Sequence, residues 1–166
     1  ARDAAIAAAG SDIRGIRIDP FAAEVRQYLI LSMGSLADER FRILFLDSSH
    51  RLIADEEMQR GTISQISLYP RTIFRRALEV NAAAIILVHN HPSGDPSPSA
   101  EDIEVTRRLD QIGRSIGIEV LDHIIVTAAY AHHLINRDPA ANRDQAAPFT
   151  LRSPDNQQAS GAEDLA

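Results

Sequence analysis

Residues 82–109 read AAAIILVHNHPSGDPSPSAEDIEVTRRL and contain the densest apolar run of the chain. The continuous run Ala83–His91 is typical of a strand that is buried on both faces of a sheet. It ends at the loop Pro92–Pro98, which holds three prolines and one glycine and so cannot form regular structure. The stretch therefore predicts a central strand whose carboxyl end opens into an irregular loop.

A helix and a further strand are predicted after this loop. The helix is expected over Ala100–Ile116, where Gly117 closes it, and the strand over Ile118–Thr127. The strand, the helix and the next strand together have room for a parallel crossover. A short element of unspecified type is expected over Ala128–Leu134.

The residues before this stretch predict a strand hairpin with helices around it. Asp19 and Pro20 suit the N-cap and the first position of a helix. The short turn Asp47–His50 favours antiparallel pairing of the strands on either side of it. The predicted elements are a helix over Phe21–Met33, strands over Phe41–Asp47, Arg51–Glu57 and Ile63–Leu68, and a helix over Arg71–Glu79. Helices interleaved with strands indicate an α/β domain with a mixed sheet.

Three parts are expected along the chain. Residues 1–18 are predicted to be a flexible lead-in and residues 19–135 a single domain. Residues 136–166 are rich in Asn, Gln, Asp, Ala and Pro and are predicted to be a disordered tail. The first residue is Ala rather than Met, so whether the chain is a fragment of a longer protein stays open.

The composition narrows the possible chemistry. The chain has a net charge of -6 and no cysteine, and all 17 basic residues are Arg. Thiolate nucleophiles, Cys-containing zinc sites and lysine Schiff bases are thereby excluded, so a metal would be bound through His and carboxylates. The negative charge gives no reason to expect direct DNA binding. No run reaches the roughly 18 apolar residues of a membrane span, and we expect a cytoplasmic protein without membrane contact.

Two histidines at the end of the central strand predict a metal site. His89 and His91 are two residues apart, so their rings point to the same face, with attachment points roughly 7 Å apart. Asp102 is expected in the first turn of the following helix. Two imidazoles and one carboxylate form a common catalytic zinc set, which leaves the fourth position open for water.

Each of these residues also has a purely structural interpretation. A buried strand can carry His for packing alone. Ser99 and Asp102 match the Ser-x-x-Asp pattern of a helix capping box. Capping and metal binding are compatible, because a cap fixes the loop that aims Asp102 at the metal.

The spacing His-x-His, seven residues, Ser, two residues, Asp resembles the JAMM motif of the JAB/MPN metallohydrolases. The stretch quoted above, together with FLDSSHRLIADEEMQRGT at 45–62 and GIEVLDHIIV at 117–126, is similar to the RadC branch of that family. The resemblance covers about residues 20–127. It implies a curved mixed sheet flanked by helices, in the cytidine-deaminase-like JAMM/MPN architecture. It also implies zinc bound by His89, His91 and Asp102, with Ser99 helping to hold a developing oxyanion.

The resemblance further implies an upstream Glu that acts as general base on water. Three residues are candidates, namely Glu39, Glu56 and Glu57. Glu39 is favoured because it lies just before the strand Phe41–Asp47, where the wider family carries its Glu. Either of the other two could equally be a solvated charge at the edge of the hairpin.

Polar residues outside this motif have other possible roles. Asp122 and His123 could hydrogen-bond the ligand imidazoles from behind, or form a buried and satisfied pair. His50 is expected to face solvent. His132 and His133 lie where the sequence departs from the family, which usually continues with a Gly-containing turn.

Two functions from different classes follow. The first is a zinc-dependent hydrolase that acts on a protein or peptide substrate, since relatives with this motif are peptidases and isopeptidases. The second is a DNA-repair or replication-associated protein whose main role is binding. This expectation rests only on the name of the RadC branch, which was historically given for DNA repair. The helix-hairpin-helix segment of RadC proteins is not found in this sequence, which counts against direct DNA contact. The scissile bond, the partner and the oligomeric state are left open.

Overall fold

The computed structural model describes residues 13, 15–61 and 70–135. Within these ranges the chain forms a mixed α/β fold. The helices and strands are α2 (Ala23–Met33), β1 (Arg40–Leu46), β2 (Leu52–Arg60), α3 (Pro70–Glu79), β3 (Ala84–Asn90), α4 (Ala100–Ser115), β4 (Glu119–Val126) and β5 (Ala131–His133). None of the helices in the described ranges is long and apolar enough to cross a membrane.

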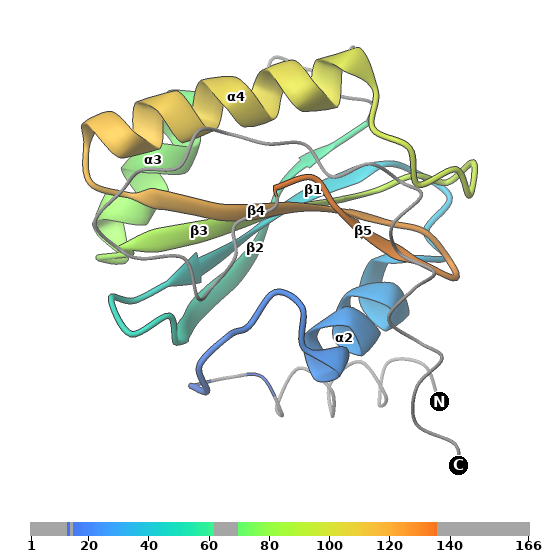
Figure 1. The fold of residues 1–166 in the computed structure, drawn as a ribbon, viewed down its shortest axis with the longest axis horizontal. Coiled ribbons are helices and arrows are strands. Elements are labelled where there is room, and N and C mark those ends of the chain that lie inside the picture. Colours follow the sequence, from blue (N-terminus) through green and yellow to red (C-terminus); the bar gives the residue numbers. More distant parts are fainter. Residues whose placement is uncertain (1–12, 14, 62–69, 136–166) are drawn as a thin grey trace.

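The strands form one five-stranded mixed sheet in the order β2-β1-β3-β4-β5. β1 pairs antiparallel with both β2 and β3, and β5 pairs antiparallel with β4. β3 and β4 run parallel, and α4 makes the crossover between them (Figure 1). The expected fold class, a mixed sheet flanked by helices, is confirmed.

Helices cover both faces of the sheet (Figure 1). On one face, Ile86 and Val88 of β3 belong to the same buried cluster as the core residues of α2. On the other face, Ile85 and Leu87 pack with the core residues of α3 and α4. Because β3 is covered on both sides, all seven of its residues are buried, and this explains its unbroken apolar sequence.

α2 begins later than the sequence suggested. Its N-cap is Ala22, which has no side-chain cap, so the prediction that Asp19 caps the helix is wrong. Asp19 instead closes a turn, because its Oδ1 accepts from the amide of Phe21 at 2.9 Å and its carbonyl from that of Ala22 at 3.0 Å. The competing local hydrogen bond of an Asx turn therefore delays the helix.

Other predictions have different outcomes. β2 continues to Arg60, three residues beyond the predicted Arg51–Glu57. The strand predicted over Ile63–Leu68 lies outside the described residues. The division into residues 1–18, 19–135 and 136–166 stays a prediction.

A threonine organises the turn between β4 and β5. Oγ1 of Thr127 accepts from the amides of Ala129 at 3.3 Å and Tyr130 at 3.0 Å, and its own amide donates to the Tyr130 carbonyl at 2.8 Å. A side-chain oxygen can thus organise the reversal without a left-handed glycine. The predicted element over Ala128–Leu134 is present as β5.

The end of α4 fixes the crossover onto the sheet. Gly117 has a φ of 74°, and the amide of Ile118 donates to the carbonyl of Gly113 at 2.9 Å, which is the long bond of a Schellman motif. Gly117 therefore closes the helix as predicted. The chain passes so close to Gly113 that a Cβ there would lie 2.3 Å from the Ile118 carbonyl oxygen.

We expect Gly113→Ala to lower the free energy of unfolding by about 1–3 kcal/mol, because the added methyl group collides with backbone that cannot move alone. Gln111→Ala, at an exposed position of the same helix, is the control and should change stability by less than about 0.5 kcal/mol. Urea unfolding measures both. Equal stability of the two variants would contradict the packing described for Gly113.

Candidate metal centre

Two backbone arrangements place the histidines of the motif. His89 lies near the end of β3, opposite Phe41 of β1 and Ile125 of β4, and its side chain is only 2% exposed. His91 follows the strand, and its amide continues the ladder by donating to the carbonyl of Val126 at 2.9 Å. Because the extended backbone persists for two residues, both rings point to the face that α4 covers.

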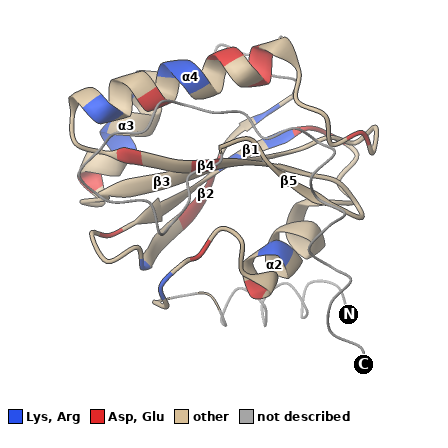
Figure 2. Cartoon of the chain, viewed as in Figure 1, with Lys and Arg blue, Asp and Glu red and all other residues tan. Residues whose placement is uncertain are grey.

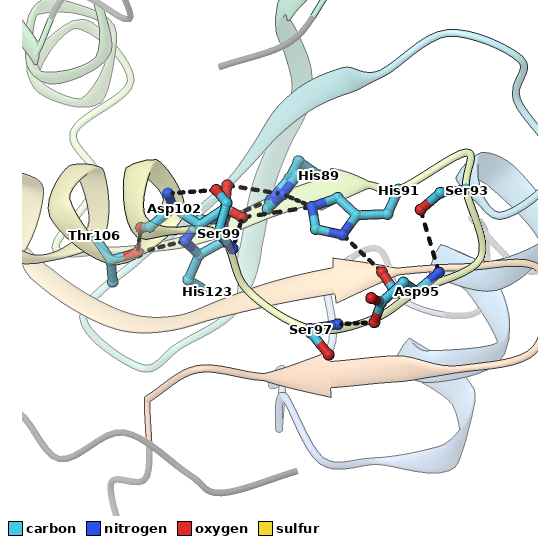
Figure 3. A network of polar contacts seen from close by, with 9 residues as sticks. All are labelled: His89, His91, Ser93, Asp95, Ser97, Ser99, Asp102, Thr106 and His123. Carbon is cyan, nitrogen blue, oxygen red and sulfur yellow. Dashed lines mark hydrogen bonds and ion pairs between the residues drawn. The ribbon is translucent and has the colours of Figure 1, made fainter. Parts of the chain in front are cut away.

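The first turn of α4 brings a carboxylate to these rings (Figure 3). Nε2 of His89 lies 3.1 Å from Oδ1 of Asp102, and Nε2 of His91 lies 3.5 Å from Oδ2. The two Nε2 atoms are 2.8 Å apart. One ligand atom from each of the three residues lies within 4.8 Å of the others, so this cluster could hold a metal ion.

Ser99 holds Asp102 in a capping box. Oγ of Ser99 accepts from the amide of Asp102 at 3.1 Å, and the amide of Ser99 donates to Oδ2 of Asp102 at 2.7 Å. The capping interpretation is therefore confirmed. Since the hydroxyl acts here only as an acceptor, its hydrogen remains available for a further hydrogen bond.

The irregular loop fixes the orientation of the His91 ring. Nδ1 of His91 lies 2.8 Å from the carbonyl oxygen of Asp95, an atom that can only accept. The loop stays in place through its own bonds, in which Oδ1 of Asp95 accepts from the amide of Ser97 at 2.9 Å (Figure 3). Nδ1 of His91 therefore carries the hydrogen, and Nε2 presents a lone pair to the cluster.

The electrostatics of the cluster favour a cation. Burial opposes ionisation of Asp102, but contacts with His89, His91 and the Ser99 amide outweigh it and hold the pKa of Asp102 well below its ordinary value. Burial also disfavours a charge on His91, yet Asp102, the Asp95 carbonyl and Glu39 raise the pKa of His91. A buried anion between two nitrogen atoms thus draws positive charge to this point. Nitrogen and carboxylate donors without sulfur suit zinc and related divalent ions.

A further pair of buried side chains lies behind His89. Nδ1 of His89 is 2.8 Å from Nε2 of His123 in β4, and Nδ1 of His123 is 2.5 Å from Oγ1 of Thr106. Burial lowers the pKa of His123 well below its ordinary value. Sequence reasoning missed Thr106, although its position four residues after Asp102 places both on one face of α4.

Asp122 lies on the opposite face of the sheet. Its Oδ2 is 2.5 Å from Nδ1 of His133, whose ring stacks on Phe21 at 4.4 Å between centroids. Asp122 therefore forms the buried and satisfied pair with a histidine other than the expected His123. His50 is 29% exposed and lies 4.0 Å from Glu119, so it faces solvent only in part. His132 is buried in β5.

The three candidate general bases have different surroundings. Oε1 of Glu56 lies 2.7 Å from Nη2 of Arg76 on α3. Glu57 is held by Arg60 at 2.6 Å and by Arg40 at 3.0 Å. Glu39 lies close enough to contribute to the raised pKa of His91, and within the described residues no ion pair of its carboxylate is found. Of the three candidates, only Glu39 is among the groups that raise the pKa of His91.

Asn90 secures the backbone on both sides of Glu39. Its Oδ1 accepts from the amide of Arg40 at 2.7 Å, and its Nδ2 donates to the carbonyl of Asp38 at 3.0 Å. Asn90 is fully buried and lies between the two histidines in sequence. The segment that carries Glu39 is therefore tied to the strand end that carries the metal-site residues, a link that sequence reasoning missed.

Comparisons with known proteins find a family and two relatives that are similar to this chain. A model of the RadC-like JAB domain matches residues 21–136. A UPF0758 protein of Polaromonas sp. (strain JS666 / ATCC BAA-500) is 50% identical over 107 residues, which are 64% of this chain and 48% of that protein. A UPF0758 protein of Cupriavidus pinatubonensis is 47% identical over 110 residues, or 66% of this chain and 48% of that protein. The chain thus spans about half the length of these curated relatives. The match to the domain model covers more than half of the chain, which accordingly belongs to the RadC-like JAB family.

Proposed function

We propose that the chain is a zinc-dependent hydrolase of the JAMM type that cleaves a peptide or isopeptide bond. The observation that carries the proposal is the convergence of His89, His91 and Asp102, whose ligand atoms lie within 4.8 Å of one another. Membership of the RadC-like JAB family supports it, since the same three residues belong to the stretch that resembles the JAMM motif. A protein or peptide substrate is part of the proposal and is taken from the family.

His89, His91 and Asp102 would hold the zinc ion, because they are the donor set of a three-residue catalytic site. When bound, zinc supplies Lewis acidity, which makes water acidic enough to ionise near neutral pH. The protein would contribute the fixed directions of the donor atoms. His91 is aimed by the Asp95 carbonyl and Asp102 by the Ser99 cap, so little reorganisation is needed for binding.

Glu39 would move protons in this reaction. It lines an open pocket together with Pro92 and Ser93, the residues that follow His91. Its carboxylate would accept a proton from the attacking water and then deliver it to the leaving nitrogen, as general base and general acid. The Arg partners of Glu56 and Glu57 make these two residues poorer candidates. The clamp of Asn90 on Asp38 and Arg40 would keep Glu39 in reach.

Ser99 would stabilise the negative charge that develops on the carbonyl oxygen of the substrate. Its Oγ is an acceptor in the capping box, so its hydrogen can still be donated. A fixed donor aimed at a developing oxyanion lowers the barrier, and its removal commonly costs about 10²–10³ in rate.

The distribution of charge does not favour DNA as the substrate. Arg positions are interspersed with Asp and Glu positions along the described elements, for example along α4 (Figure 2). The pocket beside Glu39 contains Arg60 together with Asp38 and Glu39, so charges of both signs meet there. A polypeptide with mixed polar and charged groups fits this lining better than a polyanion.

We expect purified protein loaded with zinc and dialysed to retain about one zinc ion per chain. His89→Ala should lose it, because one of three donors is removed. His50→Ala is the matched control, since His50 lies in a turn away from the cluster, and it should keep its zinc. Elemental analysis by inductively coupled plasma mass spectrometry gives the ratio of zinc to protein. Retention of zinc by folded His89→Ala would contradict the assigned site.

Glu39→Gln should retain zinc but lower hydrolysis by about 10²- to 10⁴-fold, because the proton acceptor is lost while the metal donors remain. Glu57→Gln is the control and should cleave at nearly the rate of the unsubstituted protein. The measurement is the appearance of new amino termini in a proteome-derived peptide library, followed by mass spectrometry. The reverse order of the two variants would assign the base to Glu57.

Metal affinity should fall as the pH falls. The proton and the metal compete for Nε2 of His91, whose pKa is raised, so the loss should begin above the ordinary imidazole value of about 6.5. Asp102 stays ionised throughout, since its pKa is held well below the ordinary value. Titration with Co²⁺ at several pH values measures this. An affinity that is constant from about pH 8 to about pH 6 would contradict the linkage.

A further inference from the structure

A continuous chain of hydrogen bonds runs behind the candidate metal centre. It passes from His89 to His123, then to Thr106, and returns to the backbone carbonyl of Asp102 (Figure 3). All four residues are buried and come from three elements, β3, β4 and α4. We propose that Thr106 and His123 are positioning residues, which fix the tautomer and the ring direction of His89 for metal binding. This inference rests on the proposed function in that it requires a metal at the cluster.

Thr106 determines which atoms donate and which accept along this series of hydrogen bonds. Its hydroxyl has a single hydrogen, and Oγ1 lies 2.5 Å from the carbonyl oxygen of Asp102, which can only accept. The hydroxyl hydrogen of Thr106 is therefore donated to the helix backbone. Toward Nδ1 of His123, which is 2.5 Å away, the same oxygen can act only as an acceptor.

His123 passes this constraint to His89. A neutral imidazole has one N–H and one lone pair, and His123 is fully buried with a hydroxyl and an imidazole, rather than a carboxylate, at its two ring nitrogens. Since Thr106 requires the hydrogen on Nδ1 of His123, its Nε2 must accept. Nδ1 of His89, at 2.8 Å, is then the donor.

The consequence appears on the metal side of His89. With its hydrogen on Nδ1, His89 presents a bare Nε2 to Oδ1 of Asp102 at 3.1 Å and to Nε2 of His91 at 2.8 Å. His91 also presents a lone pair, because its Nδ1 donates to the carbonyl of Asp95. Two lone pairs at this separation repel each other unless a cation or a proton lies between them. The hydrogen bonds on the outer sides of both rings therefore prepare the inner sides for a metal ion.

The same hydrogen bonds also connect the part of the site on α4 with the part on β3. Asp102 contributes its carboxylate to the cluster and its backbone carbonyl to Thr106. A closed ring of contacts thus joins the first turn of α4 to β3 through β4. Hydrogen-bond partners of this kind behind a metal ligand typically contribute a 10- to 100-fold effect on metal affinity.

The test is the affinity of the folded, metal-free chain for Co²⁺ and Zn²⁺, measured by competition with a chelator. Thr106→Val keeps the shape of the side chain but removes the acceptor, and should weaken binding by about 10- to 100-fold. Thr106→Ser restores the hydroxyl and should bind within a few-fold of the unsubstituted chain. His133→Asn is the matched control, because His133 is a buried and hydrogen-bonded histidine on the other face. It should leave the affinity unchanged even if it lowers stability.

The outcomes separate this inference from the proposed function. If the unsubstituted chain binds neither metal, the proposed function is wrong. If it binds and Thr106→Val binds equally well, the metal site stands and the positioning role is overturned. Should Thr106→Val fail to fold, long-range ¹H–¹⁵N spectra of the unsubstituted chain decide, since they identify the tautomer of His123. Hydrogen on Nδ1 supports the inference, and hydrogen on Nε2 contradicts it.

Discussion

The rest of the site depends on one interaction, the contact of the buried Asp102 carboxylate with two imidazole nitrogens. A charge that is 2% exposed is costly unless its oxygens are hydrogen-bonded or paired with positive charge. The amide of Ser99 satisfies one oxygen at 2.7 Å, and the nitrogen of His89 faces the other at 3.1 Å. The remaining requirement for positive charge is what makes the cluster suitable for a metal ion.

The fold meets this requirement through its parallel crossover. His89 lies near the end of β3 and His91 directly follows the strand. The loop then reverses the chain and the first turn of α4 returns to the same point, so one continuous segment supplies all three candidate donors. The alternation of side chains along β3 then divides the work between the two faces. His89 points toward α4, while Asn90 points away and holds the backbone beside Glu39. The end of β3 thus carries two of the three candidate metal donors and aligns the segment that bears the candidate base.

Features that are determined by a local sequence pattern could be predicted from the sequence. The apolar run of β3, the glycine end of α4 and the spacing of His89, His91 and Asp102 were all predictable, because each depends on residues close in the chain. Contacts of Asn90 with residues about fifty positions away, and of Thr106 with His123, were not predictable, because they depend on the pairing of β1 with β3 and of β3 with β4. The role of the Asp95 carbonyl has no sequence signal, since any residue provides that atom. Among the three glutamates, only the family resemblance favoured Glu39 in the sequence, and the structure adds the Arg partners of Glu56 and Glu57.

The most direct test of the account is a crystal structure of the zinc-loaded chain, with anomalous scattering measured at the zinc edge. The account predicts one strong peak bonded to Nε2 of His89, Nε2 of His91 and the carboxylate of Asp102, at about 2.0–2.2 Å from each. Water in the remaining position should lie within hydrogen-bond reach of Glu39. A peak elsewhere, or none at this cluster in crystals that contain zinc, would contradict the central claim.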